Sequence, residues 1–580
     1  FLARAQAAAE VNPPLVLPES LAAPARVAAP PLRLAEGMSA QPLMAVRSAE
    51  TAAGDQLEAL TAWNRAGNRP VRIGFARPLP SSQKVVLTAA AKGLARPTPY
   101  AGGFVSESLA GRVVWGTSLR VEGAYRLRVH LTDVAVPAGT RFWVYGLGEE
   151  PRAFGLELLG PDGGIWTPSV GGGEVYLEAE LPAGAPADGQ TARFTVREVS
   201  ESFRLDAEGS PVLTPDPAPI GECIVDATCV STATLDVVDA YRRAVASLVF
   251  VDGGQEFVCS GALLNDTDQA TLIPYLLTAN HCFDTQAAAS TLEAFWDYRS
   301  TTCNGVAPNL FGLQRSNGST LLATGAGSDF TFVRLNSIPS NRVFLGWDDR
   351  APANNTRLYR ISHPFGEPQS YSTGLVKTSG VPVCADSPRP RFLYSQVTQG
   401  GTFGGSSGSP VILAGGFTVG QLNGGCGPSA DDGCDYDNSE IDGAFIQTYP
   451  AIRQWLSPPV TNPGVCTPNA TTLCLSGGRF QVRTQWQTAQ GASGDGMAVS
   501  LTSDTGYFWF FNSSNVEMVI KVLNACSLNS RFWVFSGGLT DVRVVTTVTD
   551  VQTGNVKTYT NPLSTKFQPV QDTNAFGACP

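Results

Sequence analysis

The twelve cysteines divide the chain into three parts. Residues 1–220 contain none, eight lie between Cys223 and Cys434, and four lie between Cys466 and Cys579. Both groups are even in number, and neither shows the paired C-x-x-C spacing of a zinc site. We therefore expect disulfide bonds in both groups, which implies folding in an oxidising compartment. Buried free thiols are the alternative, but several of these cysteines lie in turn-like stretches that cannot hide a thiol.

Charge and composition narrow the classes of function. The formal net charge of −10 argues against a nucleic-acid partner. Charged residues make up only 16%, while 60 glycines and 41 prolines require frequent turns, so we expect an all-β protein. With 580 residues the chain is long enough for several domains. No run of about 18 apolar residues occurs, so we expect no membrane-spanning segment.

Domain boundaries follow from changes in composition. Residues 1–7 end in an Ala-x-Ala pattern like the tail of a secretory signal peptide, which indicates a secreted, extracellular protein; a chance alanine-rich start is the alternative. An Ala/Pro-rich arm follows, and from about residue 70 alternating runs such as 71–75 and 141–145 predict a small β-sandwich. The expected division is a signal-peptide remnant at 1–7, an N-terminal region at 8–205, a linker at 206–222, a middle domain at 223–456, a linker at 457–465 and a C-terminal β-sandwich at 466–580.

The C-terminal part carries a clear strand pattern. Residues 540–550 alternate strongly, the chain turns at 553–555 and returns through 556–559, which predicts a β-hairpin. Two aromatic runs, 507–511 and 531–535, are expected to fill the core of the sandwich rather than to form a stacking platform for a ligand.

Two motifs in the middle part fit nucleophilic catalysis. LTANHC places His281 after an apolar strand, and GGSSGSP is a glycine-dense turn around Ser407. A serine hydroxyl needs a base to become nucleophilic, and glycines let backbone amides approach a substrate carbonyl. Asp329, which opens a strand-like run, is the candidate that orients the imidazole. The chain order His, Asp, Ser is that of the chymotrypsin-like double barrel and differs from the subtilisin and α/β-hydrolase orders.

These motifs resemble those of chymotrypsin-fold serine proteases, whose TAAHC and GDSGGP are similar to LTANHC and to GSSGSP at 405–410. The resemblance implies a double β-barrel in which Ser407 is the nucleophile, His281 the base and Asp329 the orienting acid. It also implies an oxyanion hole made by the amides of Gly405 and Ser407.

The bacterial lysyl endopeptidase branch resembles the chain more closely, over most of 221–456. The similar segments are Cys223-x5-Cys229, CSGALLN, SDFT, GWD and SHP. This resemblance implies the disulfides Cys229–Cys303 and Cys259–Cys282, with Cys223 bonded to Cys426 or Cys434 and Cys384 to the other.

The chain departs from the family pattern at several positions. Ser406 replaces an acid that pairs with the new N-terminus in the animal enzymes, so activation is expected to differ. Asn423 stands where the lysyl branch has a histidine, so that supporting histidine is absent. We expect His363 to be a loop residue near the active site, and His130 to be an ordinary strand residue because no nucleophile motif accompanies it. We expect Trp347 to be a core residue; the alternative, implied by the lysyl branch, is an aromatic that shapes the active-site wall.

Specificity is expected to depend on an acid. Six residues before Ser407 stands Gly401, so the trypsin-type acid is absent. Glu440 of SEIDG matches the acidic position of the lysyl branch's SDxYG motif. A buried carboxylate favours an incoming Lys or Arg, because a cation offsets its desolvation. Solvated loop acids are the alternative, since four aspartates lie nearby: Asp431, Asp432, Asp435 and Asp437.

Together these features predict a secreted bacterial serine endopeptidase made as a zymogen, acting on a protein or peptide substrate with no cofactor and no metal. Residues 8–205 resemble a pro-region that acts as an intramolecular inhibitor; a retained adhesion or carbohydrate-binding module is the alternative. Two other classes stay open: a catalytically silent protease-fold binding protein and an esterase-like hydrolase with the same triad.

Overall fold

The computed structural model describes most of the chain. The described residues are 10–16, 44–45, 50–67, 69–94, 96–108, 110–187, 189–206, 209–212, 223–230, 241–267, 272–430, 432–458, 465–577 and 579. The predicted signal-peptide remnant at 1–7, most of the Ala/Pro-rich arm, parts of both linkers and Asp431 lie outside them. The chain forms two compact units, one built mainly from 27–265 and 273–452 and the other mainly from 453–580.

The N-terminal region is a β-sandwich, as the alternating runs predict. One sheet contains β3 (Met44–Ala45), β5 (Thr98–Tyr100), β6 (Gly103–Glu107), β7 (Val113–Arg120), β9 (Arg141–Gly146), β10 (Arg152–Phe154) and β13 (Glu174–Glu180). The other contains β4 (Val71–Leu87), β8 (Arg126–Ala135), β11 (Ile165–Trp166), β12 (Val170–Gly171) and β14 (Ala192–Ser202). Apolar side chains of both sheets form one core, in which Trp115 meets Phe194 edge-on at 5.4 Å between ring centroids.

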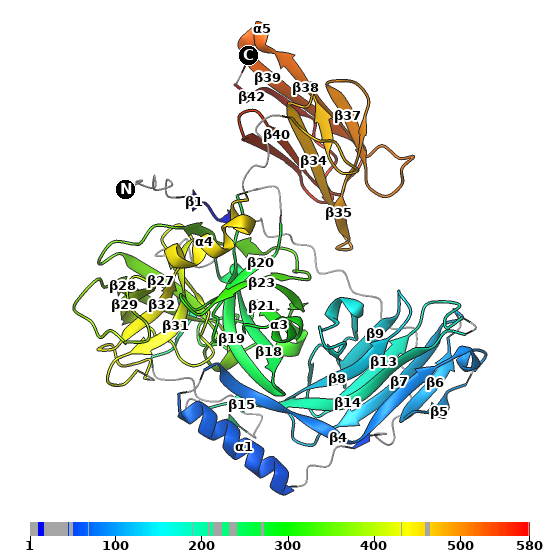
Figure 1. Ribbon diagram of the computed structural model, residues 1–580, viewed down its shortest axis with the longest axis vertical. Helices are drawn as coiled ribbons and strands as arrows, with labels where there is room; N and C mark the ends of the chain where they lie inside the picture. Colours follow the sequence, from blue (N-terminus) through cyan, green and yellow to red (C-terminus); the bar gives the residue numbers. More distant parts are fainter. Residues whose placement is uncertain are drawn as a thin grey trace, which may run out of the picture. The chain divides into compact units, whose positions relative to one another are not determined.

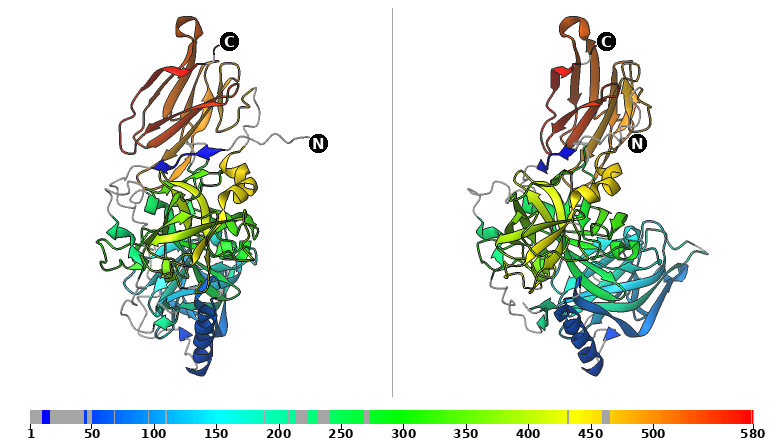
Figure 2. Two further views of the ribbon diagram at one scale, coloured as in Figure 1. Left: turned by 90° about the vertical axis from the view of Figure 1, so that its left-hand side faces the viewer. Right: turned by 60° about the vertical axis from the view of Figure 1, so that its left-hand side comes forward.

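A helix that the sequence analysis did not predict, α1 (Glu50–Arg65), precedes this sandwich. Its Ala, Leu, Gln and Glu residues are good helix formers, so composition alone could have located it. Trp63 of α1 donates its indole N–H to the carbonyl of Pro70 at 3.0 Å, which ties the helix to the start of β4. Figure 2 shows α1 outside the sheets, at the edge of its unit.

Strand β4 connects the N-terminal sandwich to the middle domain. Its start pairs with β19 (Gln255–Leu263), from Val71↔Val258 to Phe75↔Gln255, while the rest of it pairs with β14. One sheet therefore runs from the sandwich into the first barrel, and β4 can be followed between them in Figure 1.

The middle domain contains the two β-barrels expected of the chymotrypsin fold. The first is formed by β18 (Val245–Asp252), β19, β20 (Tyr275–Thr278), β21 (Glu293–Trp296), β22 (Arg315–Asn317), β23 (Ser319–Gly325) and β24 (Phe330–Leu335). The second is formed by β26 (Gly346–Asp348), β27 (Arg357–Ser362), β28 (Ser370–Val376), β29 (Phe392–Gln399), β30 (Pro410–Leu413), β31 (Phe417–Cys426) and β32 (Ser439–Ala444), and the pairing of β31 with β32 closes its sheet. Helix α4 (Phe445–Leu456) follows.

All twelve cysteines form disulfides. The pairs Cys229–Cys303 and Cys259–Cys282 confirm the prediction, and the open choice is resolved as Cys223–Cys434 with Cys384–Cys426. In the C-terminal part the bonds are Cys466–Cys474 and Cys526–Cys579.

The second unit holds the C-terminal β-sandwich. One sheet comprises β33 (Leu473–Leu475), β34 (Phe480–Gln487), β35 (Ser493–Asp495), β40 (Arg543–Asp550) and β41 (Asn555–Asn561); the other comprises β36 (Met497–Ser500), β37 (Thr505–Trp509), β38 (Met518–Ala525), β39 (Arg531–Gly538) and β42 (Val570–Phe576). The β40–β41 pairing confirms the predicted hairpin. Phe508 and Phe532 of the aromatic runs are buried in the core, whereas Phe511 is exposed.

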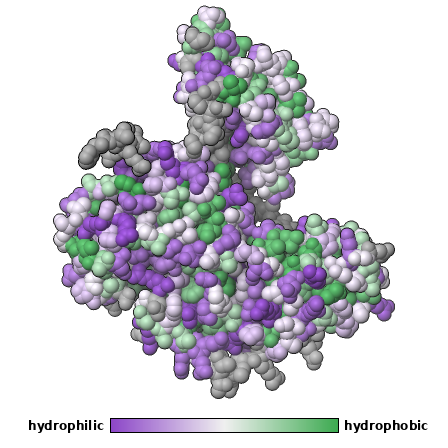
Figure 3. Space-filling model, viewed as in Figure 1, coloured by the Kyte–Doolittle hydropathy of each residue, from purple (hydrophilic) through white to green (hydrophobic). Residues whose placement is uncertain are grey.

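The described helices include none that is long and apolar enough to cross a membrane. In the face drawn in Figure 3, hydrophilic and hydrophobic residues are interspersed over the middle domain.

Candidate active site

His281 and Asp329 meet at the mouth of the first barrel. Nδ1 of His281 lies 2.7 Å from Oδ2 of Asp329, and the backbone amide of His281 donates to Oδ1 at 2.9 Å. The side-chain amide of Asn423 also donates to Oδ2, at 2.7 Å. Burial would raise the pKa of Asp329, but the charge of His281 and the hydrogen bonds from His281 and Asn423 outweigh it and hold that pKa below its usual value. The aspartate is therefore kept as a buried carboxylate.

Local backbone structure brings these two residues together. His281 follows β20, and Asp329 immediately precedes β24, the antiparallel neighbour of β20. Asp329 has a positive φ of 50°, which an aspartate tolerates better than most residues. Gln421 of β31 donates to the carbonyl oxygens of Ser328 and Asp329, so the second barrel fixes this turn.

Ser407 lies in the loop between β29 and β30, residues 400–409, which we call the serine loop and which is fastened to the first barrel. Its carbonyl oxygen accepts from the amide of Ser260 at 2.8 Å, and the next amide, that of Gly408, donates to Leu422. Gly408 has a φ of 78° and packs so closely on Thr278 and Ala279 that a Cβ there would collide with the Thr278 hydroxyl. The residue after Ser407 is thus held against the segment that leads into His281.

A disulfide supports the same arrangement. Cys259 precedes Ser260, which holds Ser407, and Cys282 follows His281; the two cysteines are bonded to each other. The covalent link therefore joins the segment that positions the serine loop to the segment that carries the imidazole.

His281 and Ser407 are not joined by a hydrogen bond in this structure. Nε2 of His281 is buried and has no hydrogen-bond partner among the described residues. Hydrogen bonds between a catalytic base and its nucleophile are often long before substrate binds. Nδ1 is occupied by Asp329, so Nε2 is the nitrogen available to a nucleophile.

The backbone around Gly405 leaves both predicted oxyanion-hole amides without an acceptor among the described residues. The Phe365 amide donates to the carbonyl of Gly404 at 2.6 Å, and because carbonyl and N–H point to opposite sides of a trans peptide, the Gly405 N–H points away from Phe365. Within the described residues, neither the Gly405 nor the Ser407 amide donates a hydrogen bond within the protein. Gly405 has a φ of 90°, and a Cβ on it would lie 2.7 Å from the Phe365 nitrogen, so the position requires glycine.

Glu440 lies between the loop that precedes Ser407 and strand β31. It is opposite Gly425 in the β31–β32 register, and its Oε1 accepts from the hydroxyl of Thr402 at 2.8 Å. Its Oε2 lies 3.3 Å from Nη2 of Arg360, which also binds Oδ1 of Asp442 at 2.7 Å. Glu440 is buried, unlike Asp432 and Asp437, which are exposed.

His363 and Trp347 are structural. His363 is fully buried, stacks on Tyr298, and its Nδ1 lies 2.9 Å from the Glu367 carbonyl; burial lowers its pKa to about 4. A fully buried imidazole of this kind stays neutral at neutral pH. Trp347 is also fully buried and packs on Phe445, so the prediction of a core residue is confirmed.

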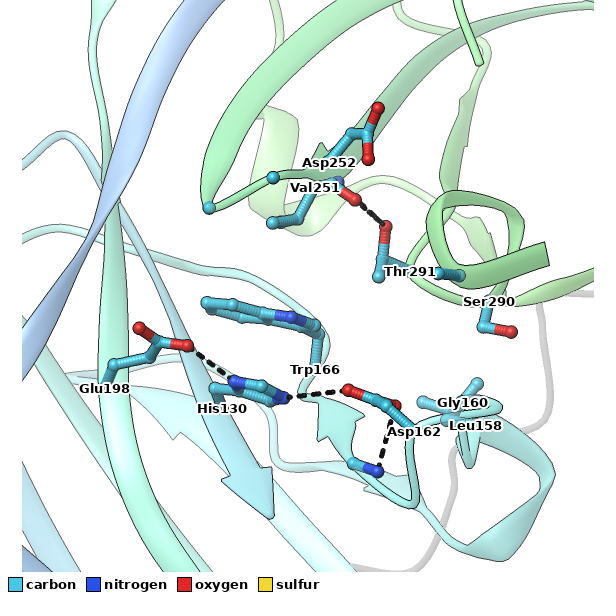
Figure 4. A pocket seen from close by; sticks show the side chains of 14 residues that line it. His130, Leu158, Gly160, Asp162, Trp166, Glu198, Val251, Asp252, Ser290 and Thr291 are labelled. Atoms are coloured by element: carbon cyan, nitrogen blue, oxygen red, sulfur yellow. Dashed lines mark hydrogen bonds and ion pairs between the residues drawn. The ribbon is translucent and has the colours of Figure 1, made fainter. Parts of the chain in front are cut away.

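His130 forms a second histidine–carboxylate pair, shown in Figure 4. Its Nδ1 lies 2.7 Å from Oε1 of Glu198, its Nε2 lies 4.0 Å from Oδ2 of Asp162, and its ring stacks on Trp166. The hydroxyl of Ser290, which lines the same pocket, donates to the Gln286 carbonyl. This pair resembles His281 and Asp329 in its Nδ1 contact, but its Nε2 faces Asp162 at 4.0 Å and has no hydrogen-bond partner, serine included, among the described residues.

The start of β4 lies directly against the serine loop. A guanidinium nitrogen of Arg69 donates to the carbonyl of Asn423, and a Cβ on Gly424 would collide with that guanidinium. A Cβ on Gly404 would likewise collide with Val71. Sequence reasoning missed Arg69 and Arg360, because no local motif relates them to the site, and it passed over Asp442 although that residue stands in the SEIDG motif.

The two barrels and the geometry between them make this chain a trypsin-like serine endopeptidase of the chymotrypsin fold. Residues 219–439 match the family model of the lysyl endopeptidase C-terminal domain. A lysyl endopeptidase of Pseudomonas aeruginosa is 29% identical over 348 residues, which cover 58% of this chain and 72% of the relative. The chain is thus similar to the lysyl endopeptidases over this part of its length.

Two more distant similarities accompany this one. The secreted RxLR effector protein 73 of Plasmopara viticola is 29% identical over 200 residues, covering 32% of this chain and 45% of that protein. Among solved structures, the HtrA-type protease AlgW with a tripeptide aligns with a TM-score of 0.29 and 15% identity, covering 43% of this chain and 70% of that one.

Proposed function

We propose that Ser407, His281 and Asp329 are the catalytic triad of a secreted peptidase that is made as a zymogen and cleaves after Lys or Arg. The observation that carries this proposal is the 2.7 Å contact between His281 Nδ1 and Asp329, made beside the loop of Ser407. It orients the imidazole so that its other nitrogen is free to take a proton.

Each residue of the triad has its own step in the hydrolysis of a peptide bond. Ser407 Oγ attacks the carbonyl carbon of the scissile peptide while Nε2 of His281 takes its proton, and the amides of Gly405 and Ser407 stabilise the oxyanion. His281 then protonates the leaving amine, which leaves an acyl-enzyme on Ser407. Water, deprotonated by His281, hydrolyses this ester, and the buried Asp329 carboxylate stabilises the imidazolium formed in each half of the reaction.

Glu440 is proposed to bind the basic side chain that precedes the scissile bond. It lies beside the Ser407 loop, and its Oε1 is turned to Thr402 of that loop. A buried carboxylate at this place offers a charge-assisted hydrogen bond to a Lys or Arg side chain of the substrate. A neutral substrate side chain would bring no cation to offset the desolvation of this carboxylate.

Residues 8–205 are proposed to act as an intramolecular inhibitor. Support comes from Arg69 and Val71, which lie against Asn423, Gly424 and Gly404, backbone that a peptide must approach to reach Ser407.

The interface between this region and the first barrel combines a buried apolar cluster, in which Phe75 and Phe203 pack with Val249, with buried charged groups. Arg126 pairs with Glu256 at 3.2 Å, and Ser169 donates its amide to Glu293 at 3.0 Å.

Secretion is proposed from the cysteine chemistry. All twelve cysteines are oxidised, as in proteins that fold outside the reducing cytosol, and one similar protein carries the word secreted in its name.

The decisive experiment measures hydrolysis of a Lys or Arg peptide substrate and of the matching ester by the wild type and Ser407→Ala. We expect the variant to lose peptidase activity by about 10⁴-fold or more. Ser290→Ala is the matched control, because it removes the hydroxyl beside the other histidine–carboxylate pair and should leave both rates unchanged.

The other outcomes separate the alternatives. Unchanged hydrolysis by Ser407→Ala would contradict the assigned nucleophile, and no activity in the processed wild type would favour a silent binding protein. Ester hydrolysis without peptide hydrolysis would favour an esterase-like enzyme.

A further inference from the structure

Glu440 belongs to a buried group of three charges. Glu440 and Asp442 stand two residues apart on β32, so their side chains leave the same face of the strand. Arg360 reaches both from β27, with Nη2 at 3.3 Å from Glu440 and at 2.7 Å from Asp442. We call these three residues the charge cluster.

The charge cluster is enclosed by the second barrel. Arg360 is 2%, Asp442 0% and Glu440 8% exposed. Nη1 of Arg360 lies 3.3 Å from the carbonyl of Ser409, two residues after Ser407, so the arginine is also attached to the serine loop. Because interactions between buried charges are weakly screened, the net charge of the cluster determines how strongly it attracts a cation bound next to it.

One arginine facing two carboxylates leaves a net charge of −1, which changes if either carboxyl takes up a proton. The shorter contact of Arg360 is to Asp442, whereas the Oε1 oxygen of Glu440 is turned to Thr402 at the serine loop. If Asp442 were neutral, Arg360 would balance Glu440 alone, and a basic substrate side chain would meet a neutral cluster.

We propose that Asp442 is a positioning residue for substrate specificity: by binding Arg360 it leaves the carboxylate of Glu440 uncompensated and so available to a basic P1 side chain. The inference rests on the proposed function, because it takes Glu440 as the residue that meets that side chain.

Asp442 can also lose its charge within an ordinary pH range. Burial raises the pKa of Asp442 to about 6; Arg360 acts against this shift and Glu440 adds to it, and these two are the charged groups that face it. Its Oδ2 has no hydrogen-bond partner among the described residues, so it can accept the proton. Asp442 is ionised above that pH and neutral below it, which makes the preference for basic side chains weaken as the pH falls through about 6.

The test is the ratio of kcat/KM for a peptide with Lys or Arg at P1 to kcat/KM for the same peptide with Gln at P1, measured from pH 5 to 8. A pH effect on the catalytic steps common to both substrates cancels in the ratio. In the wild type we expect the ratio to fall about tenfold as Asp442 is protonated, since one unit charge near the P1 cation is lost.

In Asp442→Asn we expect the low ratio at every pH, with the Gln peptide cleaved as in the wild type. Asp437→Asn, on the exposed loop before β32, is the matched control and should keep the wild-type profile.

A ratio in Asp442→Asn that equals the wild-type ratio, or a wild-type ratio that does not change with pH, would overturn the inference. If Asp442→Asn does not fold, the wild-type profile decides alone. The two proposals fail differently: an inactive processed wild type removes the proposed function and this inference with it, whereas an active, Lys/Arg-preferring processed wild type with a flat ratio removes only the role of Asp442.

Discussion

The side-chain amide of Asn423 donates to Oδ2 of Asp329 at 2.7 Å, and the same oxygen lies 2.7 Å from Nδ1 of His281. An amide thus supports the aspartate at the position where the lysyl endopeptidase pattern has a histidine. We expect Asn423→Ala to lower kcat/KM about tenfold or more, because a hydrogen bond to a buried carboxylate is lost. Steady-state kinetics check this, with KM expected to change little. Normal kcat/KM in a folded variant would show that Asp329 needs no such support.

Gly408 is expected to tolerate no side chain. Both its φ of 78° and the collision of a Cβ with Thr278 oppose Gly408→Ala, so we expect a loss of about 3 kcal/mol or more in the free energy of unfolding. Gly172→Ala is the matched control, with a φ of 79° and open space around the added methyl, and should cost only about 1–2 kcal/mol. Denaturant unfolding measures both, and equal losses would contradict the role of the collision.

The Cys259–Cys282 disulfide is expected to contribute both stability and activity. The double variant Cys259→Ser with Cys282→Ser should lose about 2–4 kcal/mol of unfolding free energy. Since the bond joins the segments that hold Ser407 and His281, kcat should also fall. The matched control is removal of Cys466–Cys474 in the C-terminal sandwich, which should leave kcat unchanged. A kcat unaffected by both changes would separate this bond from catalysis.

The full chain is expected to be latent. Intact protein should hydrolyse a small Lys or Arg substrate slowly, and activity should rise when the N-terminal region is removed and a new N-terminus appears between 205 and 222. Because Arg69 binds the carbonyl of Asn423, Arg69→Ala should raise the activity of the intact chain several-fold, while Arg96→Ala, at an exposed site, should not. Rate assays with N-terminal sequencing test this; full activity of the intact wild type would instead favour a retained binding module.

Glu440 is expected to control the choice of P1 residue. Glu440→Gln should reduce kcat/KM for Lys and Arg peptides about 100-fold relative to uncharged P1 residues, because a charge-assisted contact is replaced by a neutral one. A panel of P1 residues measures this, with Asp437→Asn as the control for general loss of negative charge. A Lys/Arg preference that survives in Glu440→Gln would remove Glu440 from substrate binding.

Much of the architecture follows from local patterns. His281 and Ser407 stand in short contiguous motifs, the alternating run 71–75 lies in β4, the run 540–550 contains β40, and two disulfides agree with the family pattern. Helix α1 was missed although its composition favours a helix. The sequence analysis noted only that Asn423 replaces a supporting histidine. It did not predict the hydrogen bond from Asn423 to Asp329, because the two residues lie 94 positions apart in the sequence.

The order of the motifs and the spacing of the cysteines determine the class of this protein, because both can be read directly along the chain. Tertiary structure alone decides that Asn423 reaches Asp329, that Arg69 lies against β31, and that Arg360 is shared between two acids. The physical reason is that these contacts join strands distant in sequence, and the energy of a buried charge depends on what surrounds it in space.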